Sequence, residues 1–196
     1  MTIIIGILGG AGTGKTSVAE HLIKTFGAVR HSFAAPLKEI VRLAFDLRHE
    51  QVYGSQAEKE AIDPRYNVSA RWLLQRIGTE GVRAVLGSDF WITACLHGIQ
   101  DAGRQREALG GKPYIAVIDD VRFENEATAI RKRDGVTIRL HAPIGSAAET
   151  SIDASHASEA NVYSIFADAE IQPKCRGLAE LFKTVDEELE YLGVEP

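Results

Sequence analysis

Apolar and polar positions along the chain predict strands and helices in alternation. Residues 2–8 are apolar at nearly every position, which indicates a strand buried on both faces. Residues 15–26 place their apolar side chains on one helical face, and Gly27 ends that helix. Further strands are expected at 29–33, 114–118, 136–140 and 168–171, and further helices over 36–47, from Ser69, and over 89–99, 123–133 and 178–192. This alternation predicts an α/β fold with a parallel five-stranded sheet flanked by helices on both sides.

Three stretches lack such a pattern. Residues 49–68 are polar and broken, so we expect a surface excursion there, and residues 102–112 are expected to form a loop rich in glycine and charge. Residues 142–166 are rich in alanine and serine, with weak periodicity. We therefore expect a single domain over 1–196, with its core in 1–33 and 113–196, a helical insert at about 34–112 and a lid loop at about 142–166.

Composition narrows the class of protein. The 196 residues are 45% apolar and 25% charged, and the net charge of -5 disfavours a broad nucleic-acid interface. Cys95 and Cys175 form neither a disulfide framework nor a spaced metal motif, which favours a reducing cytoplasm. The sequence has no apolar run of membrane-spanning length and no signal peptide before the first strand, so we expect a cytoplasmic protein without a membrane partner.

The first predicted strand leads into a glycine-rich segment, Gly9 to Thr16, that reads GGAGTGKT. It fits the pattern G-x-x-x-x-G-K-[ST], in which glycines let backbone N–H groups point at phosphate oxygens and the next helix presents its positive end to them. We therefore expect Lys15 to reach the β- and γ-phosphates of ATP, and the Thr16 hydroxyl to ligate Mg²⁺. The expected nucleotide-binding residues are Gly10, Ala11, Gly12, Thr13, Gly14, Lys15, Thr16 and Ser17.

A second cluster, Asp119-Asp120-Val121-Arg122, follows the strand expected at 114–118. Ligands of parallel sheets bind at the C-terminal ends of the strands, so this turn is expected on the same rim as the phosphate loop. Asp120 can hold Mg²⁺ or its water, as a Walker-B aspartate does, and Arg122 can grip an acceptor phosphate with two parallel hydrogen bonds. We therefore expect Thr16 and Asp120 at the metal.

Phosphoryl transfer between two nucleotides brings many negative charges together, which arginines can neutralise. Arg71 and Arg83 stand out within the insert, and no Lys or Arg occurs between Arg139 and Lys174. A lid at 142–166 therefore cannot supply arginines, so the positive charge must come from Lys15, Mg²⁺, the insert or the cluster Arg131–Arg133. Asp153, His156 and Glu159 repeat at a spacing of three, but a flexible loop rich in serine and alanine is a poor metal cage.

Several short motifs, in order, resemble the phage deoxynucleoside monophosphate kinases of the T-even type. Besides the phosphate loop they are Phe33–Lys38, Ser69–Gln75, Gly78–Glu80, Asp89–Trp91, Asp120–Glu126 and His156–Glu159, followed by the amphipathic C-terminal helix. The resemblance implies a P-loop nucleoside monophosphate kinase-like fold and transfer of the γ-phosphoryl group of ATP to a deoxynucleoside monophosphate. It also implies that Arg71, Gln75, Arg83 and Arg122 bind the acceptor, and that Lys15, Asp120, Arg83 and Arg122 serve catalysis.

The chain departs from that family at two positions. Thr16 stands where the T-even type has an acidic residue, and Ala142-Pro143 stands where that type has an arginine before the proline. Three alternatives stay open: another small-molecule P-loop kinase such as a dephospho-coenzyme A or sugar kinase, a kinase acting on modified bases in DNA, and a nucleotide-dependent switch or assembly ATPase. The base of the acceptor, the preferred donor and the choice between monomer and homodimer also stay open.

Overall fold

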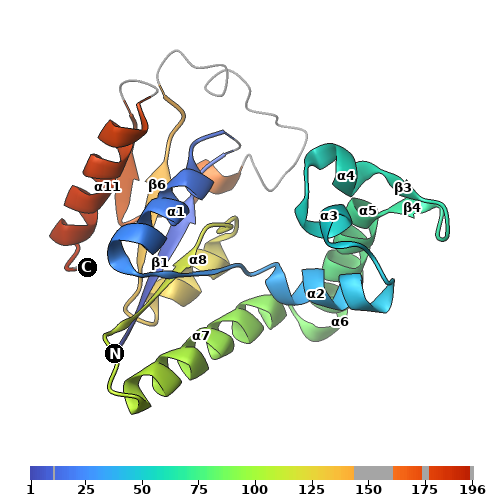
Figure 1. The fold of residues 1–196 in the computed structure, drawn as a ribbon, viewed down its shortest axis with the longest axis horizontal. Helices are drawn as coiled ribbons and strands as arrows, with labels where there is room; N and C mark the ends of the chain where they lie inside the picture. Colours follow the sequence, from blue (N-terminus) through green and yellow to red (C-terminus); the bar gives the residue numbers. More distant parts are fainter. Residues whose placement is uncertain (11, 144–160, 174–176, 195–196) are drawn as a thin grey trace. The chain divides into compact units, whose positions relative to one another are not determined.

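The apolar runs form one parallel five-stranded sheet in the computed structural model, in the order β2-β5-β1-β6-β7 (Figure 1). The strands are β1 (Thr2–Leu8), β2 (Val29–His31), β5 (Tyr114–Ile118), β6 (Val136–Leu140) and β7 (Ala169–Ile171). The structure describes residues 1–10, 12–143, 161–173 and 177–194. The α/β class and the parallel sheet predicted from the sequence are thereby confirmed.

The centre of the sheet is β1, which pairs with β5 on one side and with β6 on the other. Gly6 of β1 is level with Ile118 of β5, and Leu8 is level with Arg139 of β6. Because all pairs are parallel, the C-terminal ends of the strands lie along one edge. The phosphate loop therefore leaves the middle of that edge, directly after Leu8.

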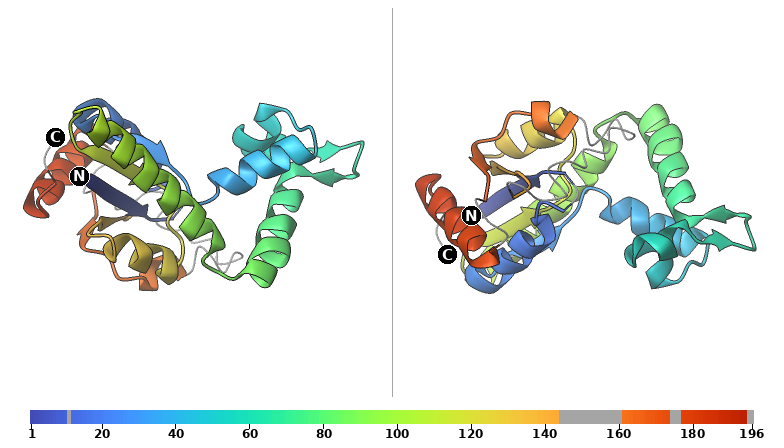
Figure 2. Two further views of the ribbon diagram at one scale, coloured as in Figure 1. Left: turned by 90° about the horizontal axis from the view of Figure 1, so that it is seen from below. Right: turned by 90° about the horizontal axis from the view of Figure 1, so that it is seen from above.

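The two faces of the sheet are covered by different helices (Figure 2). On one face, α1 (Lys15–Phe26) and α11 (Leu178–Tyr191) bury apolar side chains against Ile5 and Ile7 of β1. On the other face, α8 (Glu124–Arg131) places Ile130 against Gly6. A short 3₁₀-helix, η2 (Asn161–Ser164), precedes β7.

The chain divides into two compact units, Met1–Ser32 with His97–Pro196, and Phe33–Leu96. The first holds the sheet and is called the sheet unit, and the second is called the helical unit. Helix α7 (Phe90–Ala108) runs through the boundary. Within the sheet unit, Gly103 of α7 lies against the side chain of Thr2. None of the described helices is both long and apolar enough to cross a membrane.

The helical unit is built from short elements around its own core. They are α2 (Ala35–Ala44), α3 (His49–Tyr53), α4 (Gln56–Glu60), the hairpin β3 (Ile62–Asp63) and β4 (Val68–Ser69), α5 (Ala70–Gln75), the π-helix η1 (Arg76–Arg83) and α6 (Ala84–Leu86). The core side chains are Leu37, Val41, Leu47, Val52, Ala70, Leu73 and Trp91. As expected, the Ser69 hydroxyl caps α5, accepting from the Trp72 N–H at 3.2 Å.

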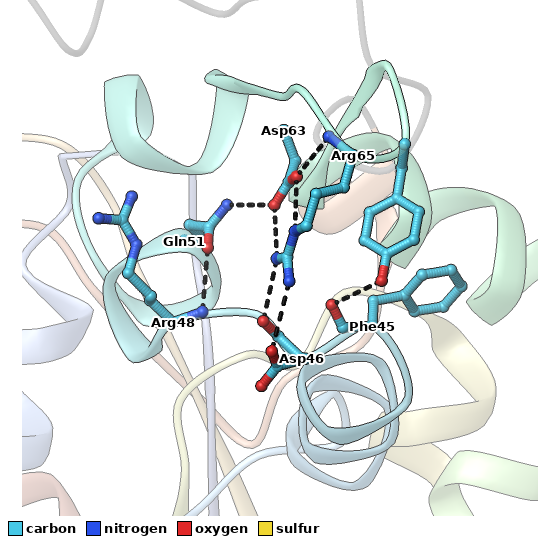
Figure 3. Close-up of polar contacts among 7 residues, drawn as sticks. Phe45, Asp46, Arg48, Gln51, Asp63 and Arg65 are labelled. Atoms are coloured by element: carbon cyan, nitrogen blue, oxygen red, sulfur yellow. Dashed lines mark hydrogen bonds and ion pairs between the residues drawn. The ribbon is translucent and has the colours of Figure 1, made fainter.

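The segment 49–68, expected as a polar and broken surface excursion, is mostly exposed but contains regular elements, namely α3, α4 and the hairpin. The buried Val52 anchors α3 in the core of the helical unit, and polar bonds connect α3 to the hairpin (Figure 3). The buried Asp63 carboxylate accepts two guanidinium bonds from Arg65, at 3.0 and 2.8 Å, and one from the Gln51 amide at 3.1 Å. Arg65 also donates to the Asp46 carbonyl at 3.0 Å. The hydrogen bonds from Arg65 and Gln51 hold the pKa of Asp63 well below its usual range.

One further local expectation is corrected, and three local features are added. Helix α7 continues to Ala108, so 102–108 is not a loop. The glycine-containing segment after Ile77 stays helical as part of η1. Strand β6 is buried on both faces, since Thr137 and Arg139 are buried together with Ile138 and Leu140. The residue after α8 with a left-handed backbone conformation is Asp134, at φ 55°.

Candidate active site

The phosphate loop closes on itself through hydrogen bonds to its own carbonyls. Lys15 Nζ donates to the carbonyls of Gly9 and Gly10, at 2.8 and 2.5 Å. The buried Thr13 hydroxyl donates to the Gly10 carbonyl at 3.0 Å. Gly14, at φ 92°, caps α1 without any side-chain hydrogen bond to the first turn. The first N–H groups of α1 therefore keep the capacity to bind an anion.

The other predicted loop residues fit the same arrangement where the structure describes them. Thr16 is exposed in the first turn of α1, and Ser17 is half-buried beside it. A methyl group added at Gly9 would lie 2.6 Å from the Leu140 carbonyl oxygen, so the loop runs close to the end of β6. Ala11 lies outside the described residues.

Tyr163 of η2 covers the loop at Gly10, a contact between distant residues that no local sequence pattern predicts. A methyl group added at Gly10 would meet the Tyr163 hydroxyl at 2.9 Å. The Tyr163 ring stacks on His141, with ring centroids 5.7 Å apart. His141 in turn hydrogen-bonds Glu170 at 3.1 Å. The phosphate loop is thus buttressed from β6, η2 and β7, which are more than 120 residues away in the sequence.

The acidic turn after β5 is held from the end of β2. The Asp119 carboxylate, 8% exposed, forms an ion pair with Arg30, and the Ser32 hydroxyl donates to Asp120 at 2.6 Å. Neither Arg30 nor Ser32 was among the predicted site residues. The rule that parallel strand ends meet on one rim could have pointed to them. His31 lies between them, and burial lowers the pKa of its imidazole, so that it stays neutral at pH 7.

Arg122 ends this turn and differs from Arg30 in its surroundings. Its side chain is exposed, and within the described part of the chain its guanidinium makes no ion pair or hydrogen bond. Its backbone N–H donates to the Glu126 carboxylate at 2.8 Å. The structure therefore places Lys15, Thr16, Asp120 and Arg122 along one edge of the sheet unit.

The remaining predicted residues belong to the helical unit, which is described by itself. Arg71 and Gln75 lie four residues apart in α5, on one face of the helix. Arg71 forms a 3.8 Å ion pair with Glu60. Arg83 is half-buried at the end of η1. The roles of these three residues at the acceptor stay predictions.

The lid loop expected at about 142–166 falls mostly on 144–160, outside the described residues, as do Asp153, His156 and Glu159. Among the residues that the structure does describe, no group of three or more His, Cys, Asp or Glu could hold a metal ion. Hydroxyl and carboxylate oxygens such as those of Thr16 and Asp120 are nevertheless the ligands that Mg²⁺ takes beside nucleotide phosphates.

Comparison with known proteins finds one protein with a similar sequence and several solved structures with a similar fold. No model of a protein family matches the chain. A protein of Acanthamoeba polyphaga mimivirus named "Putative deoxynucleotide monophosphate kinase" is 37% identical over 169 residues, which cover 83% of each chain. TT1252 from Thermus thermophilus superposes with a TM-score of 0.51 at 18% identity, over 97% of this chain and 98% of that one.

The shikimate kinase of Aquifex aeolicus superposes less well, with a TM-score of 0.46 at 16% identity over 98% of this chain and 99% of that one. The likeness to TT1252 concerns the fold alone. The mimiviral protein is similar over enough of its sequence to share a family with this chain.

Proposed function

Because the chain belongs to the deoxynucleotide monophosphate kinase family of P-loop kinases, we propose that it transfers the γ-phosphoryl group of ATP to a deoxynucleoside monophosphate, yielding the diphosphate. The observation that carries this proposal is the 37% identity to the mimiviral protein over 83% of both chains. The fold alone would allow any small-molecule P-loop kinase.

The donor half of the site fits ATP with Mg²⁺. Its phosphates would lie against the uncapped first turn of α1, with Lys15 turning from the loop carbonyls toward them. Thr16 and Asp120 offer the hard oxygen ligands that would hold the metal, which when bound neutralises phosphate charge. Lys15 contributes a mobile positive charge, and the loop backbone orients the phosphates.

The acceptor half rests on arginines. Arg122 is exposed at the rim that carries the phosphate loop, and it can bind a monophosphate with two parallel hydrogen bonds. Arg71, Gln75 and Arg83 would contact the acceptor from the helical unit, with Gln75 as the candidate for reading the base. Arg83 and Arg122 would stabilise the charge that develops during transfer.

The proposal is tested by incubating the protein with ATP, Mg²⁺ and a panel of deoxy- and ribonucleoside monophosphates, including modified pyrimidines, and by resolving the products chromatographically. We expect a diphosphate from at least one deoxynucleoside monophosphate. Lys15→Ala should lower turnover by about 10²–10³-fold or more, because its charge acts on the transferring phosphoryl group. Lys24→Ala, an exposed lysine of the same helix, is the matched control and should keep wild-type turnover.

Three results would overturn the proposal. ATP hydrolysis without transfer to any monophosphate would indicate a switch or assembly ATPase. Transfer to dephospho-coenzyme A or to DNA, with no transfer to monophosphates, would indicate one of the other kinases. Unchanged turnover in Lys15→Ala would remove the donor site as described.

A further inference from the structure

Glu126 is the most deeply buried carboxylate near the candidate site, and it faces the backbone of that site rather than solvent. Its side chain belongs to the first turn of α8 and is 2% exposed. One of its oxygens, Oε2, accepts from the backbone N–H of Arg122 at 2.8 Å and from that of Phe123 at 3.1 Å. A buried carboxylate is stable only with such partners, so its position and that of the two N–H groups depend on each other.

These two N–H groups lie where the turn after β5 becomes helix. Phe123 is extended, at φ -128° and ψ 149°, and α8 begins at Glu124. Glu126 therefore fixes the backbone that carries the Arg122 side chain. The other end of the turn is fixed from β2, through Arg30 at Asp119 and Ser32 at Asp120.

The turn is thus anchored at both ends, whereas the Arg122 side chain itself is exposed. We propose that Glu126 is a positioning residue: by holding the N–H groups of Arg122 and Phe123, it directs the Arg122 guanidinium toward the monophosphate of the acceptor. This inference rests on the proposed function. A displacement of about 1 Å at a group that orients a substrate can cost about a hundredfold in rate, so a backbone anchor can matter as much as the arginine it holds.

The inference is tested by steady-state kinetics on the full chain, with ATP and the best monophosphate from the panel each varied in turn. Glu126→Ala should lower kcat/KM for the monophosphate by about 10–100-fold and leave KM for ATP within about twofold. Glu126→Gln should stay within about threefold of wild type, because its carboxamide oxygen can accept the same two bonds. Glu124→Ala is the control. Glu124 is exposed in the same turn of α8, and in the described part of the chain its hydrogen bonds are to Thr128 and Arg131, not to the backbone of Arg122.

A positioning role of Glu126 differs from a purely structural one in that its kinetic effect depends on the presence of Arg122. In an Arg122→Ala background, Glu126→Ala should cause no further loss of kcat/KM for the monophosphate, because both changes remove the same contact. If Glu126→Ala does not fold, Glu126→Asp replaces it. The shorter side chain keeps the charge but sets the carboxylate back by one methylene group, away from the two N–H groups that Oε2 contacts, and it should show the same selective loss.

Each outcome bears on the inference. Equal kinetics in the Glu126 and Glu124 variants would overturn it, as would an additive loss in the double variant or a parallel rise of both Michaelis constants. An active enzyme in which Arg122→Ala leaves the monophosphate kinetics unchanged would also overturn it while leaving the proposed function standing. Absence of any monophosphate kinase activity in the wild type would instead refute the proposed function.

Discussion

Gly6, in the middle of β1, sets how closely α8 approaches the sheet. A methyl group built on Gly6 would lie 2.6 Å from Ile130 Cδ1, 3.2 Å from Val121 Cγ2 and 3.4 Å from Thr137 Cγ2. These three side chains are at most 1% exposed, so none can move into solvent. We therefore predict that Gly6→Ala forces α8 away from β1 and destabilises the sheet unit.

The size of the effect follows from these contacts. Overpacking a closed core by one methyl group costs about 1–3 kcal/mol, against which alanine gains about 0.5–1 kcal/mol over glycine in a strand. Ile130→Val removes the Cδ1 methyl that is nearest, at a cost of about 0.5–1.5 kcal/mol by itself. With the clash relieved, the double variant should be more stable than the sum of the single changes predicts, by about 1 kcal/mol.

The free energy of unfolding is measured by urea titration followed by circular dichroism, because Trp72 and Trp91 both lie in the helical unit and would not report on β1. Gly98→Ala in α7 is the control, since an added methyl group there meets nothing within 4 Å. It should be neutral or stabilise by up to about 1 kcal/mol. Wild-type stability of Gly6→Ala, or strict additivity with Ile130→Val, would refute the reasoning.

Two predictions concern the helical unit. Gly78→Ala would place a methyl group 2.4 Å from Leu37 Cδ2 and should destabilise by about 1–3 kcal/mol; the fluorescence of Trp91, whose indole N–H donates to the Gly78 carbonyl, reports the transition. Arg65 lowers the pKa of Asp63 in the folded protein. At acidic pH the folded state therefore binds fewer protons at this carboxylate than the unfolded state does. The contribution of Asp63 to the free energy of unfolding is fully present above the unfolded-state pKa of about 3.9, and it falls as the pH drops below that value. Urea titrations between pH 2 and 6 should therefore show a shallower acid loss for Asp63→Asn than for wild type.

Signals that are local in the sequence predicted the framework of the fold. The apolar runs of β1 and β5, the helical stripe of α1 and the Ser69 cap each depend on residues within a single helix or strand or at its end. The phosphate loop is equally local, because its hydrogen bonds run from Thr13 and Lys15 to carbonyls at most six residues away.

Contacts between distant residues could not be predicted in this way. Ser32 bonds a residue 88 positions away, and Tyr163 meets Gly10, which lies 153 positions earlier in the sequence. The short helices over 49–60 were missed because each is five residues long, too short to show an apolar stripe with helical spacing. In the sequence, Glu126 is only the last residue of a motif. Its proposed positioning role rests on the hydrogen bonds that it accepts from the backbone N–H groups of Arg122 and Phe123.

The distribution of positive charge within the sheet unit supports the proposed role of Arg122. Arg30 is committed to Asp119, and Arg139 is 4% exposed and forms an ion pair with Glu170. Arg131 donates to Glu124 and to the Phe166 carbonyl. Each of these arginines stabilises an element of the fold and would lose that partner by turning to a substrate. In the described part of the sheet-unit rim, Lys15 and Arg122 are thus the two cations to which the proposed function assigns phosphates, Lys15 on the donor side and Arg122 on the acceptor side. Since no Lys or Arg occurs in the sequence between Arg139 and Lys174, a loop from that stretch cannot replace either of them.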